Sequence, residues 1–339
     1  MRFFLIAFAF CCVVPDLYAG RGDLAGTAAG SELLIPIGAR SIALGGSSLS
    51  TVDGLEAIYW NPSGLAYSSS NVDLMASHMS YLADIGVDYA AVGTGMGDLG
   101  RVAISAKTLS FGQIPITTED QPDGTGQYAS PSYSVIGATV ARAITDHIAF
   151  GINVNYVVET MEDVSATGFA FTAGLQYHGL GGIDALSLGV VVRNIGSPLQ
   201  YSGDALIQNA VIDNTQRGSS QVAVIASSDD LPSTIEIGMG YKLPVADKSS
   251  ISFTATYVNN NYSDDEYAFG AEYNYSDLIY LRGGFNFLSQ EEPTTNVFGP
   301  AGGFGINTTV GGAKVNFDYT YRSAQLFSGN HIFAIQIGF

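Results

Sequence analysis

The sequence contains few charged residues, almost no cysteine and no long hydrophobic run beyond its first residues. Only 13% of its 339 residues are charged, against about 25% in a typical soluble domain. Lysine and arginine total 13 while aspartate and glutamate total 31, so the net charge is −18. This balance argues against a nucleic-acid partner, because such a partner needs a basic face. The hydrophobic fraction of 47% excludes a disordered chain.

Cysteine is confined to an N-terminal stretch. Arg2 there precedes an apolar run that contains Cys11 and Cys12. This order is typical of a secretory signal peptide, which we predict over residues 1–19. A lipoprotein is the weaker interpretation, since Phe10 precedes Cys11 where a small residue is expected. The exported remainder then has no disulfide. It also has no stretch of about 18 apolar residues, the length of a transmembrane helix.

Beyond residue 70, apolar and polar residues alternate. Phe150, Ile152 and Val154 fall on one face of a strand, and Gly151 and Asn153 on the other. We predict fourteen strands of about ten residues, the span of a tilted transmembrane strand. Their approximate ranges are 71–81, 84–95, 99–111, 131–144, 146–160, 165–178, 183–196, 231–243, 249–259, 264–274, 277–290, 299–310, 313–324 and 330–339. An even number permits a closed antiparallel barrel, which leaves no unpaired edge in lipid.

The charged residues of these strands follow the same alternation. A lipid-facing Arg or Lys near the membrane midplane costs about 2–4 kcal/mol, so charge belongs in the lumen or at the rims. The predicted lumen charges are Arg101, Lys107, Arg193, Lys242, Arg282, Lys314, Arg322, Glu159, Glu236, Glu272 and Asp318. A soluble β-sandwich with one wet face is the alternative, but it does not explain the large aromatic residues on the other face.

The connections and the last residues agree with a membrane barrel. Connections after even-numbered strands are short, and those after odd-numbered strands tend to be longer, which is typical of outer-membrane barrels with periplasmic turns. Both chain ends are therefore expected in the periplasm, with lipid and lipopolysaccharide around the barrel. A final strand that ends in phenylalanine resembles the signal read by the barrel assembly machinery, and its outward residues are Phe333, Ile335, Ile337 and Phe339. We predict a transmembrane barrel over residues 71–339.

Residues 20–70 do not alternate and are rich in glycine, alanine and serine. Gly45 and Gly46 permit a close backbone approach, and Pro62 biases Asn61 to an extended conformation that starts a turn. Small residues at this density favour a segment folded inside the lumen. We therefore predict an N-terminal plug, or hatch, within the barrel.

The runs GARSIALGG at 38–46 and AIYWNPSGLA at 57–66 resemble the start of PorV/PorQ-type proteins, a branch of the FadL-like outer-membrane barrels. The resemblance implies a fourteen-stranded barrel with an N-terminal hatch, in which Arg40 and Asp53 help to anchor the hatch. Ser63 stands where FadL-like chains usually have alanine. The hatch motif comprises Gly38, Ala39, Arg40, Gly45, Gly46, Asp53, Trp60, Asn61, Pro62 and Gly64.

No pattern in the sequence points to catalysis. The four histidines form no zinc-spaced pair and no cysteine is available as a ligand, so no metal and no cofactor are expected. We expect no enzyme, although a Ser, His and acid that meet only in three dimensions remain the alternative. Acidic pairs in the predicted outer loops are interpreted as solvated, with cation bridging to lipopolysaccharide as the alternative. They are Glu119–Asp120, Asp229–Asp230, Asp264–Glu266 and Glu291–Glu292.

Two functions of different classes remain. PorV-like proteins act with the type IX secretion system, so the resemblance implies that the outer loops bind secretion components or the C-terminal domain of secreted cargo. FadL-like barrels instead pass long-chain fatty acids or other hydrophobic compounds through a lateral opening beside a kinked strand. The glycine run at 302–305 is a candidate for that kink, or else it relieves crowding in a filled lumen. The long loop at 197–230 is a candidate lid or docking surface.

Overall fold

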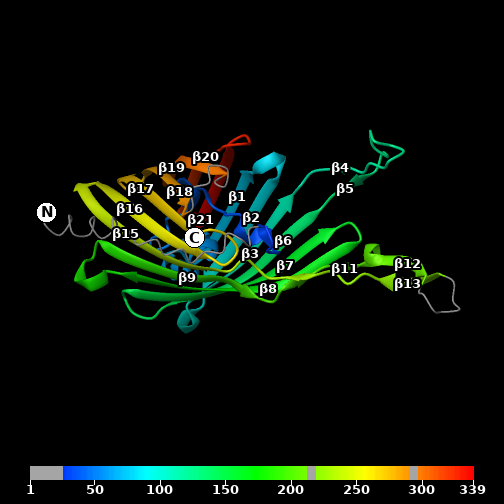
Figure 1. Cartoon of the computed structure of the whole chain (residues 1–339). Helices are drawn as coiled ribbons and strands as arrows, with labels where there is room; N and C mark the ends of the chain where they lie inside the picture. Colours follow the sequence, from blue (N-terminus) through cyan, green and yellow to red (C-terminus); the bar gives the residue numbers. More distant parts are fainter. Residues whose placement is uncertain (1–25, 212–218, 290–296) are drawn as a thin grey trace.

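The computed structural model describes residues 26–211, 219–289 and 297–339. The predicted signal peptide lies outside them. Fourteen strands form a closed antiparallel barrel, and β1 pairs with β21 to complete the ring (Figure 1). The strands are β1 (Val72–Ser80), β2 (Gly86–Gly95), β3 (Arg101–Ser110), β6 (Ser132–Ala143), β7 (Ile148–Met161), β8 (Val164–His178), β9 (Leu186–Gly196), β15 (Thr234–Ala246), β16 (Ser249–Asn260), β17 (Glu266–Tyr275), β18 (Ile279–Leu288), β19 (Phe298–Val310), β20 (Ala313–Ala324) and β21 (Asn330–Gly338). The predicted barrel is confirmed, and each predicted strand overlaps one of these.

The long connections carry small elements of their own, which extend beyond one end of the barrel (Figure 1). The first holds β4 (Ile114–Pro115) and β5 (Tyr128–Ala129), and the second holds β10 (Leu199–Gln200), β11 (Ser202–Gly203), η8 (Asp204–Leu206), β12 (Ile207–Val211), β13 (Ser219–Ala223) and β14 (Ser228–Asp229). Tighter turns contain η5 (Leu82–Asp84), η6 (Gly97–Leu99) and η7 (Leu180–Gly182). The helices of the described residues are all too short or too polar to cross a membrane.

The two faces of the strands differ as the alternation predicts. Large apolar side chains such as Ile104 and Phe169 are exposed on the outer face, and rings of Phe269, Phe285 and Phe287 stack there. Eight of the eleven predicted lumen charges are at most 9% exposed: Lys107, Glu159, Arg193, Glu236, Glu272, Arg282, Asp318 and Arg322. Arg101 is half-buried, and Lys242 and Lys314 are exposed near the turns.

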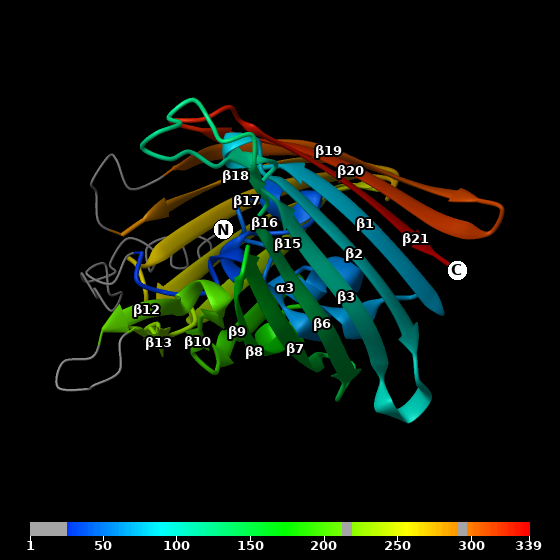
Figure 2. The same ribbon diagram turned by 90° about the vertical axis from the view of Figure 1, so that its right-hand side faces the viewer.

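The N-terminal part of the described chain lies inside the barrel (Figure 2). We call residues 26–70 the lumenal segment. It contains η2 (Ser31–Leu34), α2 (Ala39–Ala43), η3 (Gly54–Glu56), α3 (Ala57–Trp60) and η4 (Pro62–Tyr67). Its elements touch opposite sides of the ring, since η4 packs on β6, β7 and β8 while α2 packs on β18 to β21. Leu44, Leu49, Leu55 and Leu65 are fully buried there, so the lumenal segment provides much of the apolar core.

Glycine on the inner face of the wall makes this packing possible. A Cβ atom at Gly284 would overlap the backbone of Leu44 and Gly45, and one at Gly174 would overlap the side chain of Asn61. The barrel wall and the lumenal segment therefore meet at very short range at these positions, which accounts for part of the 41 glycines of the sequence.

The predicted kink at residues 302–305 is wrong. Gly302, Gly303 and Gly305 pair in regular register with β18 and β20. The irregularity falls earlier, between Phe298 and Ala301, where Pro300 has no N–H to donate to a neighbouring strand. A Cβ atom at Gly303 would overlap the Tyr319 carbonyl oxygen and the Thr320 hydroxyl of β20, and it would lie 3.2 Å from Ala43 of α2. This glycine thus relieves crowding against β20 and α2, which is the other interpretation of the run.

Candidate functional site

The buried Arg193 of β9 binds the end of helix α3. Its Nε and Nη2 donate to the carboxylate of Glu236 at 2.6 and 2.8 Å. The remaining donors reach the carbonyl oxygens of Tyr59 and Trp60. A helix end leaves such carbonyls without internal partners, and a bidentate Arg–carboxylate pair is a strong, directional donor set for them. One wall ion pair thus holds the lumenal segment in place.

A second ionic network joins α2 to the opposite wall. Arg40 donates to Glu272 at 3.1 Å, and Glu272 also accepts from Arg282 at 2.6 Å. Arg282 then donates to Asp318 at 2.5 Å. Asp53 lies 3.4 Å from Arg40 and is largely exposed. The structure therefore places Arg40 chiefly against the barrel wall and only secondarily against Asp53.

The Asn-Pro turn is fastened by the Asn61 side chain. Its Nδ2 donates to the carbonyl oxygens of Leu49 and Leu175, at 2.9 and 3.1 Å. Its Oδ1 accepts from the backbone N–H and the hydroxyl of Ser63, while Pro62 begins η4. A Cβ atom at Gly64 would overlap the carbonyl of Val52. These small and polar residues are thus required by local packing.

The rest of the motif serves the same packing. Trp60 donates its ring N–H to the carbonyl of Ile37 at 2.9 Å and covers Gly46. Gly38 has a φ of 81° and leaves room for Glu56. Ala39 accepts a hydrogen bond from Thr320 of β20 at 2.6 Å.

The largest lumenal cavity described, about 270 Å³, lies between the lumenal segment and the strand ends remote from the C-terminus. We call it the main cavity. Its charged side chains are Arg193, Glu236, Glu266 and Arg322, and its aromatic side chains are Tyr59, Trp60, Tyr81, Tyr262 and Phe298. Of these rings, only Trp60 belongs to the predicted site. The other four are missed because they come from α3, two separate loops and β19, and share no sequence pattern.

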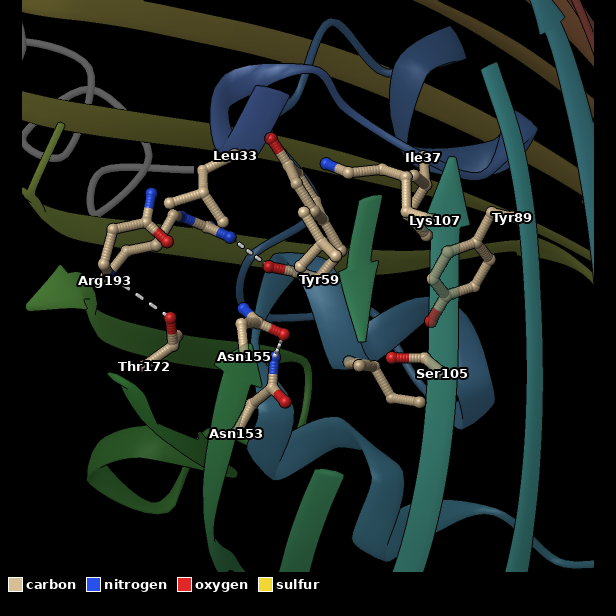
Figure 3. Close-up of a pocket in the computed structure, with 13 residues that line it drawn as sticks. Leu33, Ile37, Tyr59, Tyr89, Ser105, Lys107, Asn153, Asn155, Thr172 and Arg193 are labelled. Atoms are coloured by element: carbon tan, nitrogen blue, oxygen red, sulfur yellow. Dashed lines mark hydrogen bonds between the residues drawn. The ribbon is translucent and has the colours of Figure 1, made fainter. Parts of the chain in front are cut away.

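A smaller cavity of about 30 Å³ shares Tyr59 and Arg193 with the main cavity, and Figure 3 shows the side chains that line it. The Tyr59 ring lies close to two cations, with Lys107 Nζ 5.1 Å and Arg193 Cζ 4.9 Å from its centroid. Lys107 also donates to the carbonyl oxygens of Glu32 and Ile35. Its ammonium therefore binds the lumenal segment rather than the open lumen.

Two polar cavities lie further along the lumen. One of about 160 Å³ is lined by Arg40, Asp53, Glu56, Arg282 and Asp318 among others. The other, of about 150 Å³, includes Asp53, Asp73 and Lys314. Near the second cavity, Arg101 donates to Asp73 at 2.5 Å, and Lys314 donates to Ser69 at 2.9 Å. The lumen is thus lined by aromatic and charged side chains at one end and mainly by polar and charged side chains at the other.

Two neighbouring carboxyl groups, Glu32 and Glu159, lie at the start of the lumenal segment. Glu32 is fully buried, and neither of its carboxyl oxygens has a hydrogen-bond partner in the described part of the chain. Burial raises the pKa of Glu32 to about 8, and the neighbouring Glu159 adds to the rise. Glu159 accepts from the Gly30 N–H and from the Tyr201 hydroxyl. Glu32 is therefore held in its neutral form at neutral pH.

We expect the stability of the protein to fall as the pH rises from about 4.5 to about 8. Glu32 ionises near pH 4.5 when unfolded but near pH 8 when folded. The stability that Glu32 contributes is therefore complete below pH 4.5 and is lost as the pH rises through about 8. The Glu32→Gln variant should show a flatter pH dependence of its thermal unfolding midpoint in detergent. Glu119→Gln, in an exposed loop, is the control. A Glu32→Gln profile identical to that of wild type would contradict the assignment.

The other predicted site residues are placed as follows. Phe333, Ile335 and Phe339 are exposed and Ile337 is half-buried. His78 lies on the outer face, 2.7 Å from Asp88. Asp265 is buried and accepts from Tyr257 and Asn259, so it is structural, whereas Glu291–Glu292 lies outside the described residues. Across residues 26–211, 219–289 and 297–339, no acidic, His or Cys cluster has metal-site geometry.

Comparison with known proteins gives structural similarity only. No family model and no curated protein matches the chain. The CymD monoaromatic hydrocarbon channel is 13% identical with a TM-score of 0.56, over 90% of this chain and 98% of that one. The toluene transporter TodX of Pseudomonas putida is 12% identical with a TM-score of 0.55, over 89% of this chain and 96% of that one. A Pseudomonas aeruginosa FadL homologue is 10% identical with a TM-score of 0.51, over 92% of this chain and 99% of that one.

At these sequence identities the similarity shows the fold alone, and membership of the PorV/PorQ branch stays a prediction. The similarity nevertheless spans nearly the whole barrel and includes the N-terminal segment. The chain has the fold of the FadL-type outer-membrane channels.

Proposed function

We propose that the protein is a passive outer-membrane channel for small hydrophobic or amphipathic compounds, with the lumenal segment as its plug. The observation that carries this proposal is the main cavity, about 270 Å³ in volume and lined by five aromatic rings. Largely preformed cavities lined by aromatic groups with a few polar groups are typical of small-molecule sites. The names of similar structures, a monoaromatic hydrocarbon channel and a toluene transporter, support the same class of solute.

The route from the cavity to the lipid runs beside β19. Pairing between β18 and β19 ends at Gly284 and Ala301. The main cavity reaches Asn286, Phe298 and Gly299 beyond that point. Because β19 is irregular there, few hydrogen bonds between neighbouring strands have to break for the barrel wall to open beside the cavity. In this arrangement the short turns face the periplasm and the long loops face lipopolysaccharide.

The single tryptophan of the chain provides a direct test, because Trp60 lines the main cavity. Toluene added to the purified barrel in detergent should change Trp60 fluorescence in a saturable manner, because the solute displaces water from the indole. In proteoliposomes, the barrel should speed equilibration of the same solute compared with empty vesicles. A linear, non-saturating fluorescence change together with unchanged equilibration would refute the proposal.

The secretion function gains no support from the similar structures, which favour the transport hypothesis. It stays a prediction from the hatch motif. Its test is a pull-down from native outer membranes, in which recovery of a translocon subunit or a cargo protein would support it. We assign no reaction to the chain, and its proposed partners are the lipid, the barrel assembly machinery and the solute.

A further inference from the structure

Arg322 differs from the other buried cations of the lumen. Arg40, Lys107, Arg193 and Arg282 bind the wall or the lumenal segment, whereas Arg322 Nε and Nη2 donate to no acceptor in the described part of the chain. Arg322 is only 9% exposed, and it lines the main cavity. A buried guanidinium with unused donors is costly, because its lost hydration is not replaced. The molecule therefore holds a guanidinium with two donors that the described part of the fold does not use.

The surroundings of Arg322 are aromatic. The guanidinium carbon lies 3.7 Å from the centroid of the Phe298 ring. Tyr81 packs against that ring with centroids 5.9 Å apart, and Trp60 lines the same cavity. A guanidinium stacked on one ring still presents its edge to a planar anion.

The other charges of the cavity are already engaged. Arg193 uses its donors on Glu236 and on the carbonyl oxygens of Tyr59 and Trp60. Glu236 also accepts from Thr234, and Glu266 accepts from Asn286 at 2.7 Å. Arg322 is thus the cation of this cavity that remains available to a solute.

We propose that the main cavity binds a small aromatic carboxylate, whose carboxylate pairs with Arg322 and whose ring packs among Trp60, Tyr81 and Phe298. Rotation about the Arg322 side-chain bonds presents Nε and Nη2 to the cavity, where they match the two oxygens of a carboxylate. Offset or edge-to-face contacts with the surrounding rings hold the solute ring. The inference rests on the proposed channel function and specifies its solute class.

The lumen beyond the main cavity favours this class over a long alkyl chain. The inner face of β20 carries Arg322, Thr320, Asp318, Asn316 and Lys314 in succession. The polar cavities lie along the same face and include charged side chains from both the plug and the wall. An extended alkyl tail would meet a mainly polar lining there, whereas a compact aromatic acid lies within the main cavity alone.

Benzoate, toluene and benzylamine are the probes for an equilibrium titration of the full-length barrel followed by Trp60 fluorescence. Wild type should bind benzoate more tightly than benzylamine, because the ammonium group of benzylamine would lie near the Arg322 cation. The Arg322→Gln variant should lose about tenfold or more in its benzoate affinity relative to its toluene affinity, as expected for a charge-assisted hydrogen bond. Arg142→Gln, at an exposed position near a turn, is the matched control, and Arg322→Lys should recover part of the loss.

The outcomes separate this inference from the channel proposal. Toluene binding without benzoate binding, or equal benzoate affinities in wild type and Arg322→Gln, would overturn the Arg322 site and leave the channel standing. Absence of binding by both compounds would overturn both. If Arg322→Gln fails to assemble, the wild-type preference for benzoate over benzylamine still decides, since the opposite order contradicts the inference.

Discussion

Replacement of Arg193 by alanine is expected to destabilise the plugged barrel by about 3–5 kcal/mol. The change leaves the buried Glu236 carboxylate without its cation and removes the donors to the carbonyl oxygens of Tyr59 and Trp60. Because these groups are nearly excluded from water, the loss is much larger than at an exposed ion pair. Urea unfolding in detergent, followed by Trp60 fluorescence, measures it directly.

The same variant should loosen the lumenal segment before the barrel itself unfolds. We expect faster proteolysis within residues 26–70 and a higher single-channel conductance in planar bilayers. The double variant Arg193→Ala/Glu236→Ala should recover part of the stability, because it leaves no lone charge. Arg142→Ala is the exposed control. An Arg193→Ala barrel with wild-type stability and proteolysis would show that the ion pair does not fasten the plug.

Replacement of Gly284 by valine is expected to push α2 away from the wall. A Cβ atom there overlaps the Leu44 carbonyl carbon and the Gly45 nitrogen. Backbone atoms cannot move aside as a flexible side chain can, so the cost should be at the upper end of the ~1–3 kcal/mol typical of overpacking. Valine suits a strand by itself, so the damage should concern the plug and raise the bilayer conductance.

The neighbouring Gly283 provides the control. It lies on the same strand but on the outer face, where an added Cβ atom has its nearest neighbour at 4.0 Å. Gly283→Val should therefore keep wild-type conductance and stability. Equal effects of the two substitutions would mean that β18 rather than the contact with α2 is sensitive.

The alternation of residues was sufficient to predict the barrel. Side chains that face lipid must be apolar, and charged side chains must face the lumen. Segments with a period of two therefore predict the number of strands and which face of each strand points inward. The eleven predicted lumen charges illustrate this, because eight of them are buried inside. The glycine run at 302–305 kept two interpretations, since sequence cannot distinguish a kink from crowding against residues that come close only in the folded chain.

The sequence by itself therefore determined the fold, the polarity of the two faces and the presence of a small-residue segment for the lumen. Only the tertiary structure decided which charges are used for packing and which one remains available. Arg193 and Arg322 have the same chemistry and the same strand phase, yet one is bound to Glu236 and α3 while the other has unused donors beside Phe298. The difference arises from contacts between residues distant in sequence, which local alternation does not encode.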